Sequence, residues 1–202
     1  LSQQMVYNII AFVYPQYETL DLHGPFEMLG RMKDVNIQVL AQTPDVASYQ
    51  GQRIVADICN AELSDVYPCD CFLIPGTSET NKILENDVLT EFLKRQDKVS
   101  KTMFSVCTGS ALFAKAGLLD DKKATTNKQA FFHIKDLFPK VSWQCKARWV
   151  QTEKYLTSSG VSAGTDAALY LVKTIYGEDE AKRISTLTEY KWNEDSDNDP
   201  FS

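Results

Sequence analysis

The feature that most limits the fold is the alternation of short strand-like runs with helical patterns along the chain. Runs rich in β-branched and other apolar residues occur at 6–13, 36–41, 71–74 and 102–106. The run at 71–74 is apolar throughout, as expected for a strand that is buried on both faces. This alternation predicts βαβ units, a mainly parallel sheet and helices on both faces of that sheet.

The remaining elements follow from spacing and turn residues. Residues 20–25 are expected to form a turn, with Pro25 opening a short helix that ends near residue 31. Gly51 is expected to separate two strands that form either a hairpin or a pair of edge strands. We predict further helices and strands as follows: helices at 86–98, directly after Cys107, at 128–138, around 168–175 and at 178–191, and strands at 141–150 and 154–157. With 202 residues and no repeat or low-complexity linker, the chain is expected to form one domain, residues 1–202.

Composition excludes several partners. The formal net charge is −6, which argues against a nucleic-acid backbone or an anionic membrane. No apolar run approaches the roughly 18 residues of a membrane span. The acidic residues 193–202 are expected to form a solvated tail rather than a calcium loop, because the glycine and the distal glutamate of such a loop are missing.

The five cysteines fit neither a disulfide framework nor a zinc site. Their number is odd, Cys69 and Cys71 are separated by one residue, and the chain has only two histidines. We therefore expect free thiols, a reducing compartment such as the cytoplasm, and no metal or other cofactor. Four cysteines (Cys59, Cys69, Cys71 and Cys145) are interpreted as packing residues.

Cys107 is the exception, because it stands where a strand turns sharply into a helix. The run Met103–Val106 precedes it, and the small residues Thr108, Gly109 and Ser110 follow. Such an elbow exposes the side chain at the carboxyl edge of the sheet, and the N–H groups of a helix start favour a thiolate. The N–H of Thr108 is placed to stabilise a developing negative charge, and Gly76 is expected to offer a second N–H.

Other strand ends would meet Cys107 at the same edge of the sheet. Asp21 follows the first strand, and Gly76 and Thr77 follow the run at 71–74. A histidine usually assists such a cysteine, but none follows it here. His23 is a candidate for lining the pocket, and Asp21 is the better candidate for proton transfer, with helix capping as its competing role.

Several segments together resemble the DJ-1/PfpI superfamily, and within it the isonitrile hydratase-like branch. The resemblance covers nearly the whole chain and is carried by these stretches: "LDLHGPFEML", "FLIPGT", "SVCTGSALFAKAGLLDDKKATT" and "TSSGVSAGTDAALYLV". It implies a flavodoxin-like three-layer α/β/α sandwich that forms a homodimer and acts on a small molecule. The family's nucleophile matches Cys107, its carboxylate matches Asp21, and the threonine after the nucleophile matches Thr108. Isonitrile hydratases convert an isonitrile and water to an N-substituted formamide.

The chain departs from that pattern around the expected pocket. Thr77 stands where a second glycine is typical, Asn127 replaces the histidine of "TTH", and Ser159 falls in a modified "TGGG" stretch. The candidates for substrate or oxyanion binding are Gly76, Thr77, Gly109, His23 and Ser159. Redox sensing, small-molecule sensing and a glyoxalase-like activity remain alternatives, since each would use the same cysteine. A DNA-binding regulator is not expected, because no basic helix-turn-helix segment follows.

Overall fold

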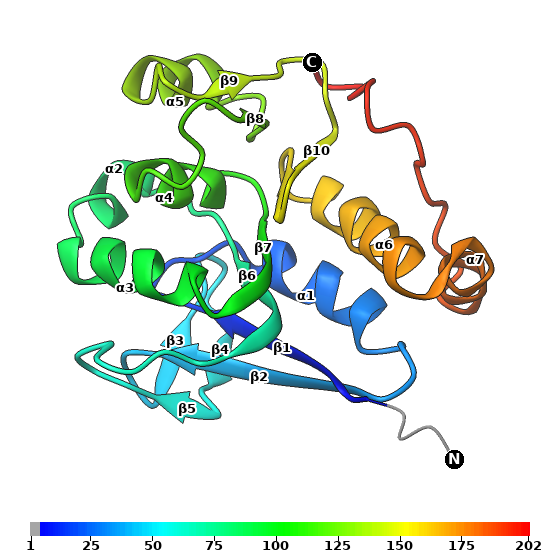
Figure 1. Cartoon of the computed structure of the whole chain (residues 1–202), viewed down its shortest axis with the longest axis horizontal. Coiled ribbons are helices and arrows are strands. Elements are labelled where there is room, and N and C mark those ends of the chain that lie inside the picture. The colour runs from blue at the N-terminus through cyan, green and yellow to red at the C-terminus, as the bar shows by residue number, and fades with distance from the viewer. Residues whose placement is uncertain (1–4) are drawn as a thin grey trace.

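A computed structural model describes residues 5–202 and shows a mixed, mostly parallel seven-stranded sheet covered by helices (Figure 1). The strand order is β10-β11-β7-β6-β1-β2-β5, and only β10 and β11 pair in antiparallel fashion within this sheet. The strands are β1 (Tyr7–Phe12), β2 (Val35–Ala41), β3 (Asp45–Ala47), β4 (Arg53–Val55), β5 (Ile58–Cys59), β6 (Cys69–Ile74), β7 (Ser100–Ser105), β8 (Lys123–Ala124), β9 (Ser142–Trp143), β10 (Trp149–Thr152) and β11 (Tyr155–Ser158). The predicted flavodoxin-like α/β class is confirmed.

The helices pack in two groups. The helices are α1 (Thr19–Leu29), α2 (Thr80–Ile83), α3 (Asp87–Asp97), α4 (Gly109–Lys115), α5 (Phe131–Leu137), α6 (Ala163–Tyr176) and α7 (Glu178–Leu187). Helix α6 packs between α1 and α7, whereas α3 packs on α4 and β7 (Figure 1). The central strands β1, β6 and β7 are buried over most of their length, as parallel strands covered on both faces should be.

Helix α1 corrects the turn that was predicted at residues 20–25. It begins at Thr19 and runs through Pro25, although proline inside a helix removes one backbone hydrogen bond. Tertiary packing on α6 outweighs this local preference. At Gly24 the two helices come so close that a Cβ atom would lie 2.4 Å from the Oγ1 atom of Thr165.

The region after α4 differs most from the prediction. Helix α5 starts at Phe131 rather than 128, and residues 128–130 form a turn whose Gln129 and Ala130 N–H groups donate to the side-chain oxygen of Asn127. The single strand predicted at 141–150 is two strands, of which β9 pairs with β8 and β10 pairs with β11. The last helix ends at Leu187 rather than 191.

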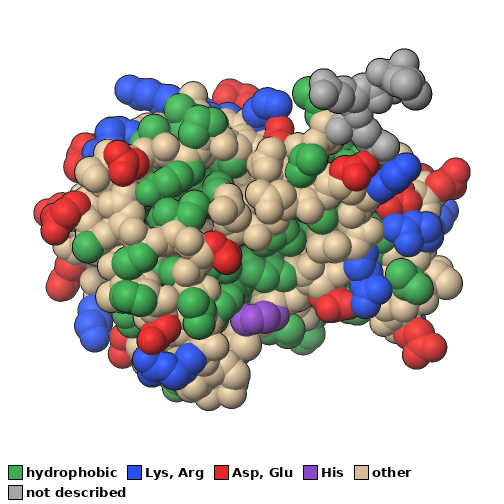
Figure 2. All heavy atoms as spheres, turned by 90° about the horizontal axis from the view of Figure 1, so that it is seen from below, with side chains coloured by type: hydrophobic (Ala, Val, Ile, Leu, Met, Phe, Trp, Pro, Cys, Tyr) green, Lys and Arg blue, Asp and Glu red, His purple; other side chains and the backbone are tan. Residues whose placement is uncertain are grey.

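The antiparallel hairpin predicted on either side of Gly51 is confirmed. Strands β3 and β4 pair with each other, and Gly51 between them has a φ of 86°, a conformation that favours glycine. Figure 2 shows the underside of the molecule, where apolar side chains form patches across the middle of the face, with an acidic side chain among them and most charged side chains toward the margins. Val55 of β4 is 75 % exposed.

Candidate active site

Cys107 occupies a strained elbow between β7 and α4. Its φ is 59°, in the left-handed region that non-glycine residues rarely adopt. Hydrogen bonds hold this conformation: the N–H of Cys107 donates to the carbonyl of Ser159 (3.2 Å), and its carbonyl accepts from the hydroxyl of Thr126 (3.1 Å). Strain of this kind costs on the order of 1–3 kcal/mol and is concentrated at functional sites.

The thiol of Cys107 opens into a small, largely polar cavity. Cys107 is 6 % exposed, and the cavity has a volume of about 380 Å³. The lining residues are Glu18, Thr77, Ser78, Thr80, Cys107, Thr108, Asn127, Gln129, Ala130 and Val161. A small molecule of a few heavy atoms can therefore reach the sulfur from this side.

Asp21 lies buried beside Cys107, in the first turn of α1. One carboxylate oxygen, Oδ2, accepts a hydrogen bond of 2.9 Å from the N–H of Gly76, and the side chain lies near enough to the Cys107 thiol for each group to affect the pKa of the other. The other oxygen, Oδ1, is buried without a hydrogen-bond partner. Burial raises the pKa of Asp21 to about 7, against the opposing effect of the Gly76 N–H, and the negative charge of Glu18 adds to the rise.

The position of Cys107 at a helix start suggested a thiolate, but in this structure the protonated thiol is favoured. Burial raises the pKa of the thiol to about 12, and the charge of Asp21 adds to the rise. The N–H groups of Val161 and Thr108 and the amide of Asn127 act in the opposite direction but do not outweigh burial. At neutral pH the pair therefore consists of a protonated thiol and a carboxyl group that is close to half ionised.

Asn127 is the contact that sequence reasoning missed. Its Nδ2 donates a hydrogen bond of 3.2 Å to the Cys107 sulfur. Its Oδ1 accepts from the N–H groups of Gln129 (2.9 Å) and Ala130 (3.1 Å), so the amide is oriented with nitrogen toward sulfur. The signal was present as the departure from "TTH", because the replaced position is the one that faces the thiol.

The glycine at 160 makes the approach of Asn127 possible. A Cβ atom on Gly160 would lie 2.5 Å from the Asn127 Nδ2 atom, too close for any side chain without a shift. The strand-to-helix connection that carries Gly160 and Val161 therefore serves the site twice. It leaves room for the Asn127 amide, and it turns the Val161 N–H toward the sulfur.

The candidate oxyanion residues divide into two groups. The N–H of Thr108 faces the sulfur, whereas the N–H of Gly76 is occupied by Asp21 and that of Gly109 donates to the carbonyl of Val106 (3.0 Å). Gly109 instead allows close packing, since a Cβ there would lie 2.7 Å from the carbonyl oxygen of Ile74.

Thr77 lines the cavity and is tied to Thr108, because its N–H donates to the Thr108 hydroxyl (2.9 Å). Ser159 approaches Cys107 only through its backbone carbonyl. His23 does not line the cavity. It is exposed on α1, with Nδ1 3.1 Å from the carbonyl oxygen of Thr19, because the helix continues through this segment and turns His23 outward.

The other cysteines only partly fit a packing role. Cys69 and Cys71 are buried in β6, but Cys59 and Cys145 are exposed, which corrects the prediction for those two. All five are free thiols. Within residues 5–202, no group of three or more His, Cys, Asp and Glu side chains is arranged to hold a metal ion, and no helix is both long and apolar enough to cross a membrane.

The fold and the site together define a class: a flavodoxin-like α/β protein with a cysteine at a strand-to-helix elbow and a buried carboxyl group beside it. A model of the DJ-1/PfpI family matches residues 7–174. The chain belongs to the DJ-1/PfpI family.

The known proteins that are similar to this chain differ from one another in function. It is 29 % identical to the isonitrile hydratase of Pseudomonas putida over 188 residues, which cover 92 % of this chain and 79 % of that enzyme. It is 27 % identical over 122 residues to the HTH-type transcriptional regulator GbdR of Pseudomonas aeruginosa, covering 60 % of this chain and 33 % of the regulator. The crystal structure of a ThiJ/PfpI family protein from Pseudomonas syringae superposes with a TM-score of 0.83 at 26 % identity, covering 94 % of this chain and 77 % of the other.

Proposed function

We propose that the protein is an isonitrile hydratase-like enzyme in which Cys107 is the nucleophile and Asp21 the general acid and base. The observation that carries this proposal is the buried Cys107–Asp21 pair, in which Asp21 has one free oxygen and a pKa raised to about 7. A group with a pKa near the working pH both accepts and returns protons efficiently. Asn127 offers only an amide, so proton transfer falls to Asp21.

The first half of the reaction adds the thiol to the terminal carbon of the isonitrile. As the sulfur bonds to that carbon, ionised Asp21 takes the thiol proton and then delivers it to the same carbon. The product is a thioimidate, in which the carbon carries one hydrogen, the sulfur of Cys107 and a double bond to nitrogen. The N–H groups of Thr108 and Val161 and the Asn127 amide stabilise the negative charge on sulfur before the new bond is complete.

The second half releases the product with one water molecule. Asp21 takes a proton from the water as its oxygen attacks the thioimidate carbon, and that proton passes to the nitrogen. The tetrahedral adduct then collapses: the carbon–sulfur bond breaks, a carbonyl forms, and the hydroxyl proton returns to the sulfur through Asp21. The free enzyme and an N-substituted formamide result, and all atoms are accounted for.

The test is to follow a simple alkyl isonitrile by NMR with the wild type, Cys107→Ala and Asp21→Asn. We expect formamide from the wild type and none above background from either variant. Full activity in Cys107→Ala would refute the proposed nucleophile. If the wild type forms no formamide, the hydratase proposal fails, and turnover of glyoxals and peroxide sensitivity of Cys107 become the next measurements.

The structure gives less support to redox sensing than to catalysis. Oxidation proceeds from an accessible thiolate, whereas the Cys107 thiol is 6 % exposed and burial raises its pKa to about 12. The glyoxalase-like alternative would have to operate with Thr108, rather than a histidine, directly after the elbow cysteine.

We further propose that the protein forms one domain over residues 1–202, that it acts as a homodimer, and that it resides in the cytoplasm. The apolar patches across the middle of the face in Figure 2 support a second copy as partner, and the exposed free thiols of Cys59 and Cys145 suit a reducing compartment. Light scattering coupled to gel filtration tests the dimer; a mass near 22.8 kDa would contradict it.

A further inference from the structure

The acidic segment after α7 is anchored on the body of the molecule rather than free, although Glu194, Asp195 and Asp197 are exposed, as predicted for a solvated tail. Figure 1 shows it running from α7 back across the molecule to the neighbourhood of β10. Backbone hydrogen bonds fix it there: the N–H of Arg148 donates to the carbonyl of Ser196 (2.7 Å), and the N–H of Asp199 donates to the carbonyl of Lys146 (2.7 Å). Asp199 is only 4 % exposed.

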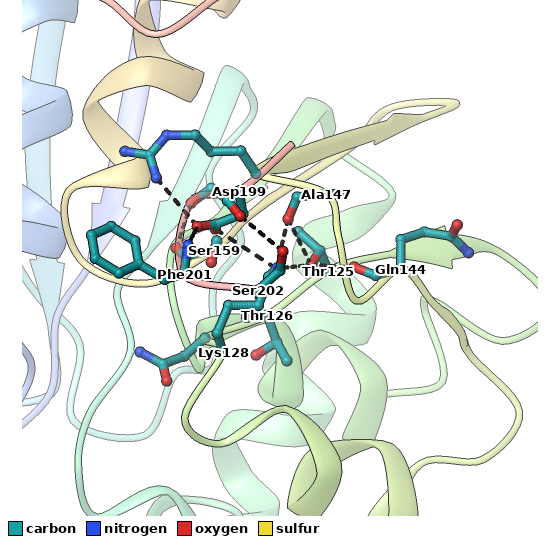
Figure 3. A network of polar contacts seen from close by, with 12 residues as sticks. Thr125, Thr126, Lys128, Gln144, Ala147, Ser159, Asp199, Phe201 and Ser202 are labelled. Atoms are coloured by element: carbon teal, nitrogen blue, oxygen red, sulfur yellow. Dashed lines mark hydrogen bonds and ion pairs between the residues drawn. The ribbon is translucent and has the colours of Figure 1, made fainter. Parts of the chain in front are cut away.

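Two cations hold the buried carboxylate of Asp199 (Figure 3). Its oxygens lie 3.8 Å from Lys128 Nζ and 3.7 Å from Arg148 Nη1. Arg148 also pairs with Asp166 on α6 at 2.7 Å, and Arg148 is itself buried. Buried charges are tolerated only when paired, so this cluster fixes the segment in one position.

The same cluster adjoins the site. Lys128 follows Asn127 in the chain, and its ammonium group donates to the hydroxyl of Thr125 (2.8 Å) and the carbonyl of Ala147 (2.6 Å). Asp199 in turn accepts a hydrogen bond of 2.9 Å from the N–H of Phe201. The segment therefore presents Phe201 at a fixed place relative to the loop that contacts the thiol.

Phe201 lines a second cavity that adjoins the first and shares three lining residues with it. This cavity has a volume of about 250 Å³, and Asn127, Gln129 and Val161 line both cavities. The Phe201 ring is 74 % exposed, so it offers free aromatic surface. The Cys107 cavity itself is lined largely by polar and small side chains, which leaves Phe201 as the one aromatic wall within the two cavities.

We propose that Phe201 is a specificity-determining residue whose ring contacts the substituent on the substrate nitrogen. This inference rests on the proposed function. With the isonitrile carbon on Cys107, a substituent that extends past Asn127 and Val161 enters the second cavity and reaches the ring. Substrates with an aromatic or bulky alkyl substituent gain this apolar contact, whereas a methyl or ethyl group is too short. Asp199 is the positioning residue for Phe201.

The test compares benzyl isonitrile with ethyl isonitrile in the wild type, Phe201→Ala and Phe132→Ala. Phe132 is a matched control, since it is 69 % exposed and lines neither cavity. We expect the ratio of kcat/KM for benzyl to ethyl isonitrile to fall roughly tenfold in Phe201→Ala, mainly through KM, and to stay unchanged in Phe132→Ala. Asp199→Asn should lower the same ratio by a smaller factor than Phe201→Ala.

A second readout does not depend on hydration. Peptide-level mass spectrometry measures the rate at which iodoacetamide and its N-benzyl derivative alkylate Cys107, separately from the exposed Cys59 and Cys145, with Cys107→Ala as the labelling control. The benzyl preference should again be lost in Phe201→Ala and kept in Phe132→Ala. If Phe201→Ala keeps both ratios within twofold of the wild type, the role of Phe201 is refuted. If no isonitrile is turned over, the alkylation ratio still decides the role of Phe201, while the proposed function alone fails.

Discussion

Replacing Asp21 by asparagine should abolish activity while stabilising the protein at alkaline pH. The folded protein raises the pKa of this carboxyl from 3.8 to about 7, chiefly by burial. Between these values the unfolded chain has released the proton and the folded protein still holds it. The folded state therefore binds more protons, and the free energy of unfolding falls as pH rises.

The size of the effect follows from the same shift. From pH 5 to pH 7 the wild type loses about 1.4 kcal/mol per pH unit through Asp21 alone, or about 3 kcal/mol in total. The stabilisation that Asp21 contributes is fully present below pH 3.8 and is lost once the pH has risen above about 7. Cys107 contributes nothing over this range, because a thiol with a pKa of about 12 stays protonated.

Guanidinium unfolding at pH 5 and pH 8 measures this difference. The wild type should lose about 3 kcal/mol more than Asp21→Asn between the two pH values. Comparing the two pH values cancels any fixed penalty of burying the asparagine amide. Asp136, an exposed carboxyl on α5, provides the control variant Asp136→Asn, which should behave as the wild type. Equal pH dependence in the wild type and Asp21→Asn would refute the claim that burial holds the proton on Asp21.

Three further changes test the surroundings of the thiol. Asn127→Ala removes the amide that donates to the sulfur and should lower kcat/KM by roughly 10- to 100-fold, measured with an isonitrile that saturates the wild type. Circular dichroism should show an unchanged fold, and a wild-type value of kcat/KM would contradict the role of the amide. Gly160→Ala should lower kcat/KM to a similar extent, because the added Cβ displaces the Asn127 amide from the sulfur. If kcat/KM falls while the rate of iodoacetamide labelling of Cys107 is unchanged, displacement of the amide is not the cause. Lys128→Met leaves Asp199 with Arg148 alone and should lower the free energy of unfolding, measured in guanidinium, by about 3 kcal/mol. A free energy of unfolding within roughly 0.5 kcal/mol of the wild type, which is the scatter of surface substitutions, would refute a structural role for the buried pair.

The sequence was informative about the site where local pattern and topology coincide. The apolar runs, the small residues after Cys107 and the carboxyl-edge rule together placed Cys107, Asp21 and Gly76 at one edge, and the structure brings these three together. The turn predicted before Pro25 failed because the packing of α1 on α6 is a long-range effect that no local signal reports.

Long-range pairing also explains what the sequence could not reveal about charge. The acidic composition of residues 193–202 indicates solvation, yet Asp199 is buried, because its two cationic partners lie 71 and 51 residues away in the chain. Local position likewise suggested a lowered pKa for the Cys107 thiol, since a helix start favours the anion. Burial of the whole pair, which only the fold determines, reverses that effect.

The raised pKa of the thiol is compatible with the proposed chemistry. Addition to an isonitrile places both the sulfur and a proton on the same carbon, so the reaction requires the thiol proton to stay within the site. A cysteine that is already ionised in the resting enzyme would have lost that proton to water. Asp21, buried with one free oxygen and a pKa near 7, accepts the proton as the sulfur attacks and holds it a short distance from the carbon that needs it. On this reasoning, a buried pair that retains its proton suits hydration of an isonitrile better than an exposed, ionised cysteine does.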